Sequence, residues 1–204
     1  MEGGSKAEGM AQLDDLLVQA ALEDPAAFAD LVRRYQDTLF NFLYRMTGNR
    51  EDAEDISQET FVRIYRALPR FRIGAPFKPW MYKIAVNLAI NHFNARKPSL
   101  ALVEDFPSVS PFTSPELMAE LRETQHDLRR ALLELPEPYR AILLLRHLNE
   151  LSYQDIAATL DVPIGTAKVR LHRARKMLQE KLFRVQGEGS HELQDSHRPP
   201  TAVP

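Results

Sequence analysis

The chain has 204 residues, of which 44% are hydrophobic and 26% charged, so it can form one medium or two small globular domains. It contains no cysteine, which excludes disulfides, thiolate metal sites and cysteine nucleophiles and fits a reducing cytoplasm. No apolar run approaches the roughly 20 residues of a membrane span, and no signal-peptide pattern opens the chain, so we expect a cytoplasmic protein without a membrane span. With a formal net charge of −2, any nucleic-acid contact must depend on local basic clusters or on a larger partner.

Helical periodicity dominates the first half of the chain, which we predict to be one helical domain over residues 11–97. The Gly-, Glu- and Ser-rich start, up to about Met10, is expected to be mobile. A short helix is predicted over residues 13–22. In the clearest pattern of the chain, apolar side chains recur at i, i+3, i+4 and i+7 from Phe28 to Met46, which predicts a helix with one face in the core.

A group of acidic residues opens the next predicted helix, which runs from Glu51 to Leu68. Negative side chains are stabilised at the positively polarised N-terminal end of a helix. The spacing of Asp52, Asp55 and Glu59 could supply metal ligands to an all-helical enzyme, but no second helix with matching His or carboxylate residues appears. We therefore interpret them as a solvated face, and we expect no catalytic residue, no metal site and no cofactor.

The segment from Thr60 to Val103 contains no acid, and within it cations alternate with aromatic residues. Cations bind phosphates and aromatic rings stack on unpaired bases, so this mixture is typical of a contact with single-stranded nucleic acid. Many of these aromatics, Trp80 among them, are also suited to the core, and composition alone leaves both uses open. Residues 70–78 are predicted to form a loop, and Pro79 suits the first turn of a helix that continues to about Phe93.

Proline and serine indicate a flexible linker over residues 98–115, followed by a second domain over residues 116–185. Its first two helices are predicted from about Glu116 to Leu135 and from Tyr139 to His147. The Gly-, Ser-, His- and Pro-rich tail over residues 186–204 is expected to be disordered.

The second domain ends in a helix-turn-helix pattern. Ser152 is a good helix N-cap, and Asp155 follows three residues later, as in a capping box. A turn at Asp161–Pro163 leads within a few residues to a second helix, which starts near Thr166 and extends to Phe183. This second helix is dense in Lys and Arg, contains a single acid, and is long enough to lie in a major groove. A solvated basic face on a helical hairpin is the alternative, but it does not account for the cap and the turn together.

In this order, the segments resemble the extracytoplasmic-function (ECF) group of sigma factors in the sigma-70 family. The resemblance is carried by Asp52–Leu68, by Phe71–Asn87, and by Leu135–Arg140 together with Ser152–Arg175. It implies an all-α protein of two small helical domains joined by a flexible linker. Sigma domain 2 then corresponds to residues 11–97, and sigma domain 4, with the helix-turn-helix, to residues 116–185.

The resemblance also implies the function and the partners. A sigma factor is not an enzyme; it directs core RNA polymerase to specific promoters, reads their −10 and −35 elements and promotes strand opening. The implied partners are the β′ and β subunits of core RNA polymerase, promoter DNA as duplex and as single strand, and an anti-sigma factor. Because the holoenzyme binds the promoter, the isolated chain need not be basic.

The matched stretches imply three sets of site residues. The polar face that contacts core polymerase comprises Asp52, Asp55, Gln58 and Glu59. The loop and helix that melt and read the −10 element comprise Phe71, Arg72, Ile73, Gly74, Ala75, Phe77, Lys78, Trp80, Lys83 and Asn87. The recognition helix that reads the −35 element carries Thr166, Lys168, Val169, Arg170, His172, Arg173, Arg175 and Lys176. For the loop, we expect Phe71 or Phe77 to form one wall of a pocket for an unstacked base.

One alternative stays open: an autonomous helix-turn-helix regulator in which residues 11–97 form an effector or dimerisation domain. The acid-free aromatic segment argues against it, because an effector domain has no need of such a segment. Binding to core RNA polymerase separates the two interpretations.

Overall fold

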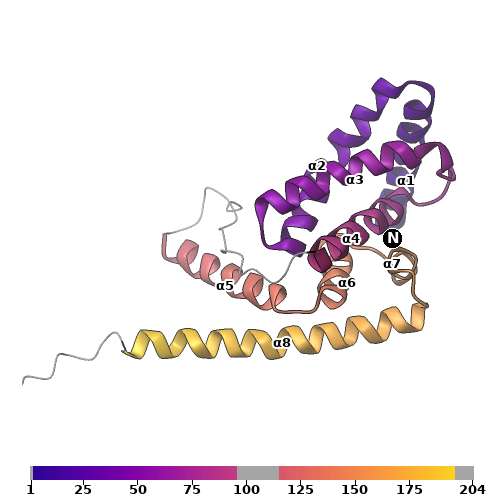
Figure 1. Cartoon of the computed structure of the whole chain (residues 1–204). Helices are drawn as coiled ribbons and strands as arrows, with labels where there is room; N and C mark the ends of the chain where they lie inside the picture. Colours follow the sequence, from indigo (N-terminus) through magenta and orange to yellow (C-terminus); the bar gives the residue numbers. More distant parts are fainter. Residues whose placement is uncertain (1, 96–114, 196–204) are drawn as a thin grey trace, which may run out of the picture.

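The computed structural model describes residues 2–95 and 115–195, with side chains described for residues 12–95 and 124–185. Every regular element within these ranges is helical, which confirms the predicted all-α fold (Figure 1). The first range contains α1 (Glu2–Glu23), η1 (Pro25–Ala27), α2 (Phe28–Thr47), α3 (Arg50–Ala67), η2 (Leu68–Arg70) and α4 (Phe77–Ala95). The second range contains α5 (Pro115–Leu133), α6 (Glu137–His147), α7 (Tyr153–Leu160) and α8 (Ile164–Asp195).

Helices α2, α3 and α4 pack together in the N-terminal part, and α1 packs on α2. The apolar stripe of α2 is buried as predicted, and its members Leu31, Leu39 and Phe42 have no exposed surface. Because full burial of such a side chain is worth about 1.5–3 kcal/mol, this stripe supplies much of the energy that holds the helices together. The carboxylate of Asp14 in α1 accepts a hydrogen bond from the Tyr35 hydroxyl at 2.5 Å, which ties α1 to this core.

Helix α8 packs against α5, α6 and α7, and Figure 1 shows it running along all three. The buried seam of α8 contains the small residues Ala167 and Ala174 and, between them, Leu171, at positions i, i+7 and i+4. The facing apolar residues of α6, Ile142–Leu145, are buried as well. Outside this seam, Lys168, His172 and Arg173 are exposed.

The two parts that the sequence predicted as separate domains pack against each other, and their buried side chains form one continuous core. Helix α7 lies against α4, while α5 and α6 lie against α2. At the C-terminal end of α2, Gly48 adopts a left-handed conformation (φ 75°) and its N–H caps the helix by donating to the Tyr44 carbonyl at 2.9 Å. Leu133 of α5 lies so close to this glycine that an added Cβ would be 2.8 Å from both of its methyl carbons.

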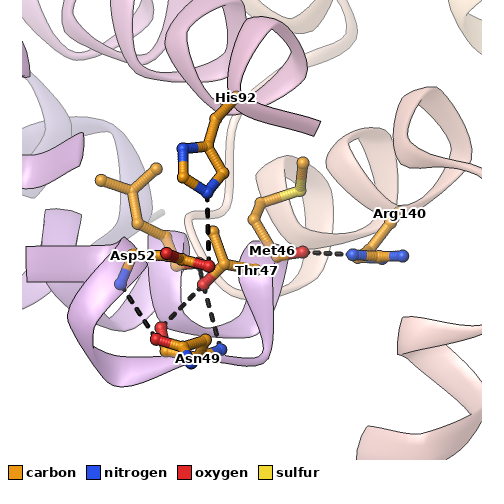
Figure 2. Close-up of polar contacts among 7 residues, drawn as sticks. Met46, Thr47, Asn49, Asp52, His92 and Arg140 are labelled. Carbon is orange, nitrogen blue, oxygen red and sulfur yellow. Dashed lines mark hydrogen bonds and ion pairs between the residues drawn. The ribbon is translucent and has the colours of Figure 1, made fainter. Parts of the chain in front are cut away.

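Two arginines of the C-terminal part donate to carbonyl groups at this same end of α2. Arg129 donates to the Gly48 carbonyl at 2.8 Å, and its guanidinium carbon lies 4.4 Å from the centre of the Tyr44 ring. Arg140 donates to the Met46 carbonyl (Figure 2). The contact between the two parts is therefore made by buried cations on backbone oxygens as well as by apolar packing.

Arg140 also holds the end of its own part of the chain, because it donates to three carbonyls at the end of α5: Leu132 at 3.0 Å, Leu133 at 2.5 Å and Leu135 at 2.9 Å. The last carbonyls of a helix lack intrahelical partners and carry partial negative charge, so they stabilise a buried cation. Burial lowers the pKa of Arg140 to about 10, and the side chain stays charged at neutral pH.

Several boundaries differ from those predicted. Helix α1 begins at Glu2, not near Leu13, and no proline interrupts it before Glu23. Helix α4 begins at Phe77, since Pro79 is tolerated in a first turn. Helix α8 continues to Asp195, through a segment predicted as disordered.

The extension of α8 has a simple physical reason: no proline occurs between Pro163, just before α8, and Pro199. The rest of the predicted tail, residues 196–204, lies outside the described residues, as does the predicted linker over residues 98–115 apart from Pro115.

The close approach of Leu133 predicts that Gly48→Ala is more destabilising than Gly74→Ala. Both glycines have left-handed backbones (φ 75° and 85°), so both variants carry a strain of about 1 kcal/mol or more. Only at position 48 does the new methyl group also meet another side chain, since nothing lies within 4 Å of it at position 74. Denaturant unfolding measures both losses, with Gly165→Ala at an open helical position as the control. Equal losses at positions 48 and 74 would contradict a tight contact at the end of α2.

Candidate nucleic-acid interface

The helix-turn-helix forms as the sequence predicted. The N–H of Asp155 donates to the Ser152 hydroxyl at 3.1 Å and the N–H of Ser152 lies 3.3 Å from the Asp155 carboxylate, which completes the capping box. Asp161 ends α7 in a left-handed conformation (φ 53°), which turns the chain toward α8. Val162 is half-buried in this turn, whereas Ile164, the first residue of α8, is 41% exposed.

The predicted contact residues of α8 lie outside its buried seam. Exposed side chains are Thr166, Lys168, Val169, His172, Arg173, Arg175 and Lys176, while Arg170 is half-buried. Val169, which belongs to the predicted −35 set, is 52% exposed. The i, i+4, i+7 spacing of Ala167, Leu171 and Ala174 is the sequence signal that identifies the buried seam.

Two of these cations contact neighbouring helices. The Lys168 ammonium lies 5.7 Å from the centre of the Tyr153 ring of α7. Arg175 Nε donates to His147 Nε2 of α6 at 3.3 Å. Partial burial, followed by the charges of Arg175 and Arg146, lowers the pKa of His147, so the ring is neutral at pH 7 and can accept this hydrogen bond. No local pattern in the sequence indicates this partner of Arg175, because His147 lies 28 residues away in another helix.

The loop between η2 and α4 exposes Arg72, Ile73 and Gly74. Gly74 has a left-handed backbone (φ 85°), and its N–H donates to the Asp15 carboxylate of α1 at 3.1 Å. A second hydrogen bond, from the Ala75 N–H to the Arg72 carbonyl at 3.0 Å, closes the turn. Helix α1 therefore helps to fix the loop, which the sequence did not predict.

The aromatic rings beside the loop form a cluster in the core. Phe71 is 9% and Phe77 2% exposed, and the centres of their rings lie 5.8 Å apart. The Trp80 ring lies 4.8 Å from that of Phe71 and 5.7 Å from that of Phe77. Packing against each other and against Trp80 leaves Phe71 and Phe77 little exposed surface in this conformation. Trp80 remains half-exposed.

Helix α4 presents the remaining predicted −10 residues. Lys78 and Lys83 are half-exposed and Asn87 is exposed, with Ala75 half-buried at the end of the loop. Trp80, Lys83 and Asn87 have i, i+3, i+7 spacing and so share one side of the helix. The Lys83 ammonium lies 3.7 Å from the carboxylate of Asp161, the residue that ends α7.

The acidic helix α3 exposes part of its predicted polar face. Asp55 and Gln58 are exposed, and the half-exposed Glu59 accepts a hydrogen bond from Arg63 at 2.7 Å. Val62 is 41% exposed beside them, at i+7 from Asp55.

Asp52 lies apart from that exposed face, because its side chain is turned toward α4 and only 8% of the residue is exposed. One carboxylate oxygen is 3.3 Å from His92 Nε2 of α4 (Figure 2). The Asp52 N–H donates to the side chain of Asn49, the N-cap of α3, at 3.0 Å. Asp52 therefore joins α3 to α4 in this conformation and offers little surface to a partner.

The described part of the chain holds no group of three or more His, Asp or Glu residues suited to a metal ion. None of its helices has the length and apolar character needed to span a membrane.

Two family models match the chain: Sigma-70 region 2 over residues 31–98 and Sigma-70, region 4 over residues 125–178. The chain is 36% identical over 169 residues to the ECF RNA polymerase sigma factor SigW of Bacillus subtilis (strain 168), covering 78% of this chain and 90% of that protein. The chain belongs to the ECF sigma factors of the sigma-70 family. As a sigma factor, it directs RNA polymerase to specific promoters.

Further relatives agree with this assignment. The sigma factor is 36% identical over 180 residues to the ECF RNA polymerase sigma-E factor of Escherichia coli (strain K12), covering 83% of this chain and 94% of that one. It is 34% identical over 193 residues to the ECF RNA polymerase sigma factor SigE of Mycolicibacterium smegmatis, and the match covers 92% of this chain and 73% of that one.

Two solved structures share the fold. CnrH in complex with the cytosolic domain of CnrY matches with a TM-score of 0.63 and 25% identity, covering 83% of this chain and 96% of that one. The sigma factor RpoE in complex with the anti-sigma factor NepR from Bartonella quintana matches with a TM-score of 0.61 and 25% identity. This match covers 76% of this chain and 96% of that one.

Proposed function

We propose that this sigma factor acts in the cytoplasm through three surfaces: α3 contacts core polymerase, the loop with α4 opens and reads the −10 element, and α8 reads the −35 element. The observation that carries the proposal is the division of α8, the second helix of the helix-turn-helix, into a buried seam and an exposed basic face. It follows the capped helix α7 after a short turn. As a DNA-binding initiation factor, the chain has no catalytic activity of its own in this proposal.

Base reading is assigned to the first exposed turns of α8. Lys168, Val169, His172 and Arg173 lie within little more than one turn near the helix start, where recognition helices meet base edges. Arg175 is directed toward His147 of α6, at the side of the helix, which suits a phosphate contact better than a base contact. Thr166 and Arg170 are likewise assigned to phosphates.

Arg173→Ala is therefore expected to relax the preference among −35 sequences by about 1–3 kcal/mol at one base pair. Arg175→Ala is expected to weaken binding to all duplexes alike and to reduce its salt dependence. The measurement is affinity for a set of −35 duplex variants at two salt concentrations, with the two variants as controls for each other. Uniform losses in both variants would contradict the assignment.

Core polymerase contact is assigned to Asp55, Gln58 and Glu59, with Val62 as an apolar centre. An exposed apolar side chain with polar neighbours is the arrangement found in protein–protein interfaces. Asp52, which completes the set implied by the resemblance, supports this face indirectly by holding α3 against α4.

Asp55→Lys is expected to weaken core binding about tenfold, or about 1.4 kcal/mol, while helical content is unchanged. The matched control is Asp37→Lys, which makes the same charge change at an exposed position of α2. A competition assay for core polymerase measures both. Normal affinity of Asp55→Lys, or equal losses in the two variants, would reject the assignment.

Promoter opening is assigned to the loop and to Trp80. Extruding a base costs a few kcal/mol, and stacking on an aromatic ring returns about 1–3 kcal/mol. Trp80 is the half-exposed ring beside the loop, and the exposed backbone around Gly74 can approach a base closely. Arg72, Lys78 and Lys83 are assigned to phosphates of the strand, and Asn87 to a base edge.

Gly74→Val and Arg72→Ala are expected to impair transcription from a duplex promoter more than core binding or −35 binding. On a template that is pre-melted across −10, much of the lost activity should return, because opening no longer limits the reaction. Transcription from the two templates, compared for each variant, is the measurement. Equal defects on both templates together with loss of core binding would mean that the loop has only a structural role.

An anti-sigma factor is proposed as a further partner. The support is that both structural neighbours were solved in complexes, CnrH with the cytosolic domain of CnrY and RpoE with the anti-sigma factor NepR. These neighbours share the overall fold with the chain described here, in which both parts pack together.

A further inference from the structure

An acidic side chain from α1 contacts the loop that is assigned to promoter opening. The chain from Thr60 to Val103, which includes this loop, contains no acid of its own. The fold nevertheless brings one there, because the half-exposed Asp15 accepts a hydrogen bond from the Gly74 N–H at 3.1 Å. A carboxylate beside a DNA-binding loop repels phosphates, so its use at this place is a contact with the protein and not with DNA.

The residue just before Asp15 fixes the orientation of α1. The Asp14 carboxylate accepts hydrogen bonds from the Tyr35 hydroxyl at 2.5 Å and from Arg34 Nε at 2.8 Å. Val18, one turn further along, is fully buried on the same side of the helix. Because consecutive helical residues point about 100° apart, this anchoring of Asp14 in the core turns Asp15 to another side of α1, where the loop lies.

Core packing holds the two ends of the loop, and Asp15 holds its middle. At one end Phe71 is buried, and at the other the Phe77 ring lies 5.2 Å from that of Tyr35. Helix α1 itself lies against η2, which precedes the loop, and against α4, which follows it. Around Gly74 the space is open, since an added Cβ would meet nothing within 4 Å. No side chain packs there to hold the loop, so the hydrogen bond to Asp15 has this role.

The conformation of Gly74 requires such a tether. Its backbone is left-handed (φ 85°), which is one of several conformations that glycine adopts with similar ease. The hydrogen bond from the Ala75 N–H to the Arg72 carbonyl closes the turn but leaves the Gly74 N–H to Asp15. A loop that is already held in its binding conformation loses less entropy when it receives a ligand, so it binds more tightly.

We propose that Asp15 is a positioning residue for promoter opening: by accepting the Gly74 N–H, it holds the loop in the conformation that receives the −10 strand. The inference rests on the proposed function of the loop. Asp15 acts through the loop backbone and not through its charge, and it does not contact DNA. Helix α1 is thereby a third element of the −10 surface, beside the loop and α4.

The test uses the full chain with two changes at one position. Asp15→Ala removes the acceptor, whereas Asp15→Asn keeps a carbonyl oxygen at the same place and removes only the charge. The matched control is Glu23→Ala, which removes an acid from an exposed position of the same helix.

The first measurement is exchange of the Gly74 amide proton with water, followed by NMR. The chain has eight glycines, so a sample labelled only at glycine nitrogen gives few signals, and the one that is lost in Gly74→Ala belongs to Gly74. We expect exchange to become about two- to tenfold faster in Asp15→Ala, as for the loss of one hydrogen bond, and to change little in Asp15→Asn and in the control. Unchanged exchange in Asp15→Ala would overturn the proposal. No DNA is present, so this result does not depend on the function assigned to the loop.

The second measurement is the affinity of reconstituted holoenzyme for a −10 single strand and for a −35 duplex. Asp15→Ala is expected to weaken −10 binding about two- to tenfold and to leave −35 binding and core binding unchanged. Asp15→Asn is expected to bind the −10 strand at least as tightly as the natural sequence, because it keeps the tether and repels phosphates less. Equal losses in the two variants would overturn the proposal, as would an equal loss of −35 affinity in Asp15→Ala, which would indicate a general structural role.

Arg72→Ala, measured in the same assay, separates failure of this inference from failure of the proposed function. If Arg72→Ala weakens −10 binding and Asp15→Ala does not, the loop contacts the strand and the role of Asp15 alone is rejected. If neither variant weakens −10 binding, the assignment of the loop to the −10 strand is rejected, and the role of Asp15 in opening is rejected with it.

Discussion

Two arginines of the C-terminal part bind carbonyl groups at the C-terminal end of α2. Arg129 donates to the carbonyl of Gly48, the residue that caps α2, and Arg140 donates to that of Met46. A buried guanidinium is costly to desolvate, so it is tolerated only where several acceptors surround it. The ends of α2 and α5 together supply such acceptors to Arg140, which donates to the carbonyls of Met46, Leu132, Leu133 and Leu135, so this side chain ties the C-terminal part to the N-terminal part.

The same turn also orients the helix assigned to polymerase binding. Only Gly48 and Asn49 separate α2 from α3, and the Asn49 side chain caps α3 while its N–H lies 3.3 Å from the Thr47 hydroxyl of α2 (Figure 2). Asp52 extends this network to His92 of α4. The residues that hold the C-terminal part therefore adjoin those that set the direction of α3.

Local patterns in the sequence predicted local structure well. The stripe of α2, the capping box at Ser152 and the basic recognition helix depend on residues a few positions apart, and each appears where expected. Burial of functional candidates was predicted less well. Asp52 and Phe77 carry the polar and aromatic signatures of contact residues, but their side chains are used inside the molecule.

Packing between the two parts could not be predicted, because it joins residues far apart in the chain. The hydrogen bond from Arg140 to Met46 and that from Thr159 to Pro79 leave no periodic signal, since their acceptors are backbone carbonyls that every residue carries. A proline-rich segment between two helical patterns is typical of a linker, and it says nothing about whether the joined parts touch.

The central claim is that buried arginines at the end of α2 join the two parts into one cooperative unit. Denaturant unfolding can test it with two signals: fluorescence of Trp80, the single tryptophan, for the N-terminal part, and a fluorophore on a cysteine introduced at Gln154 for the C-terminal part. The account predicts that both signals change in one transition in the natural sequence and separate into two in Arg140→Gln, with the C-terminal part unfolding first. Two separate transitions in the natural sequence, or a single shared one in Arg140→Gln, would contradict it.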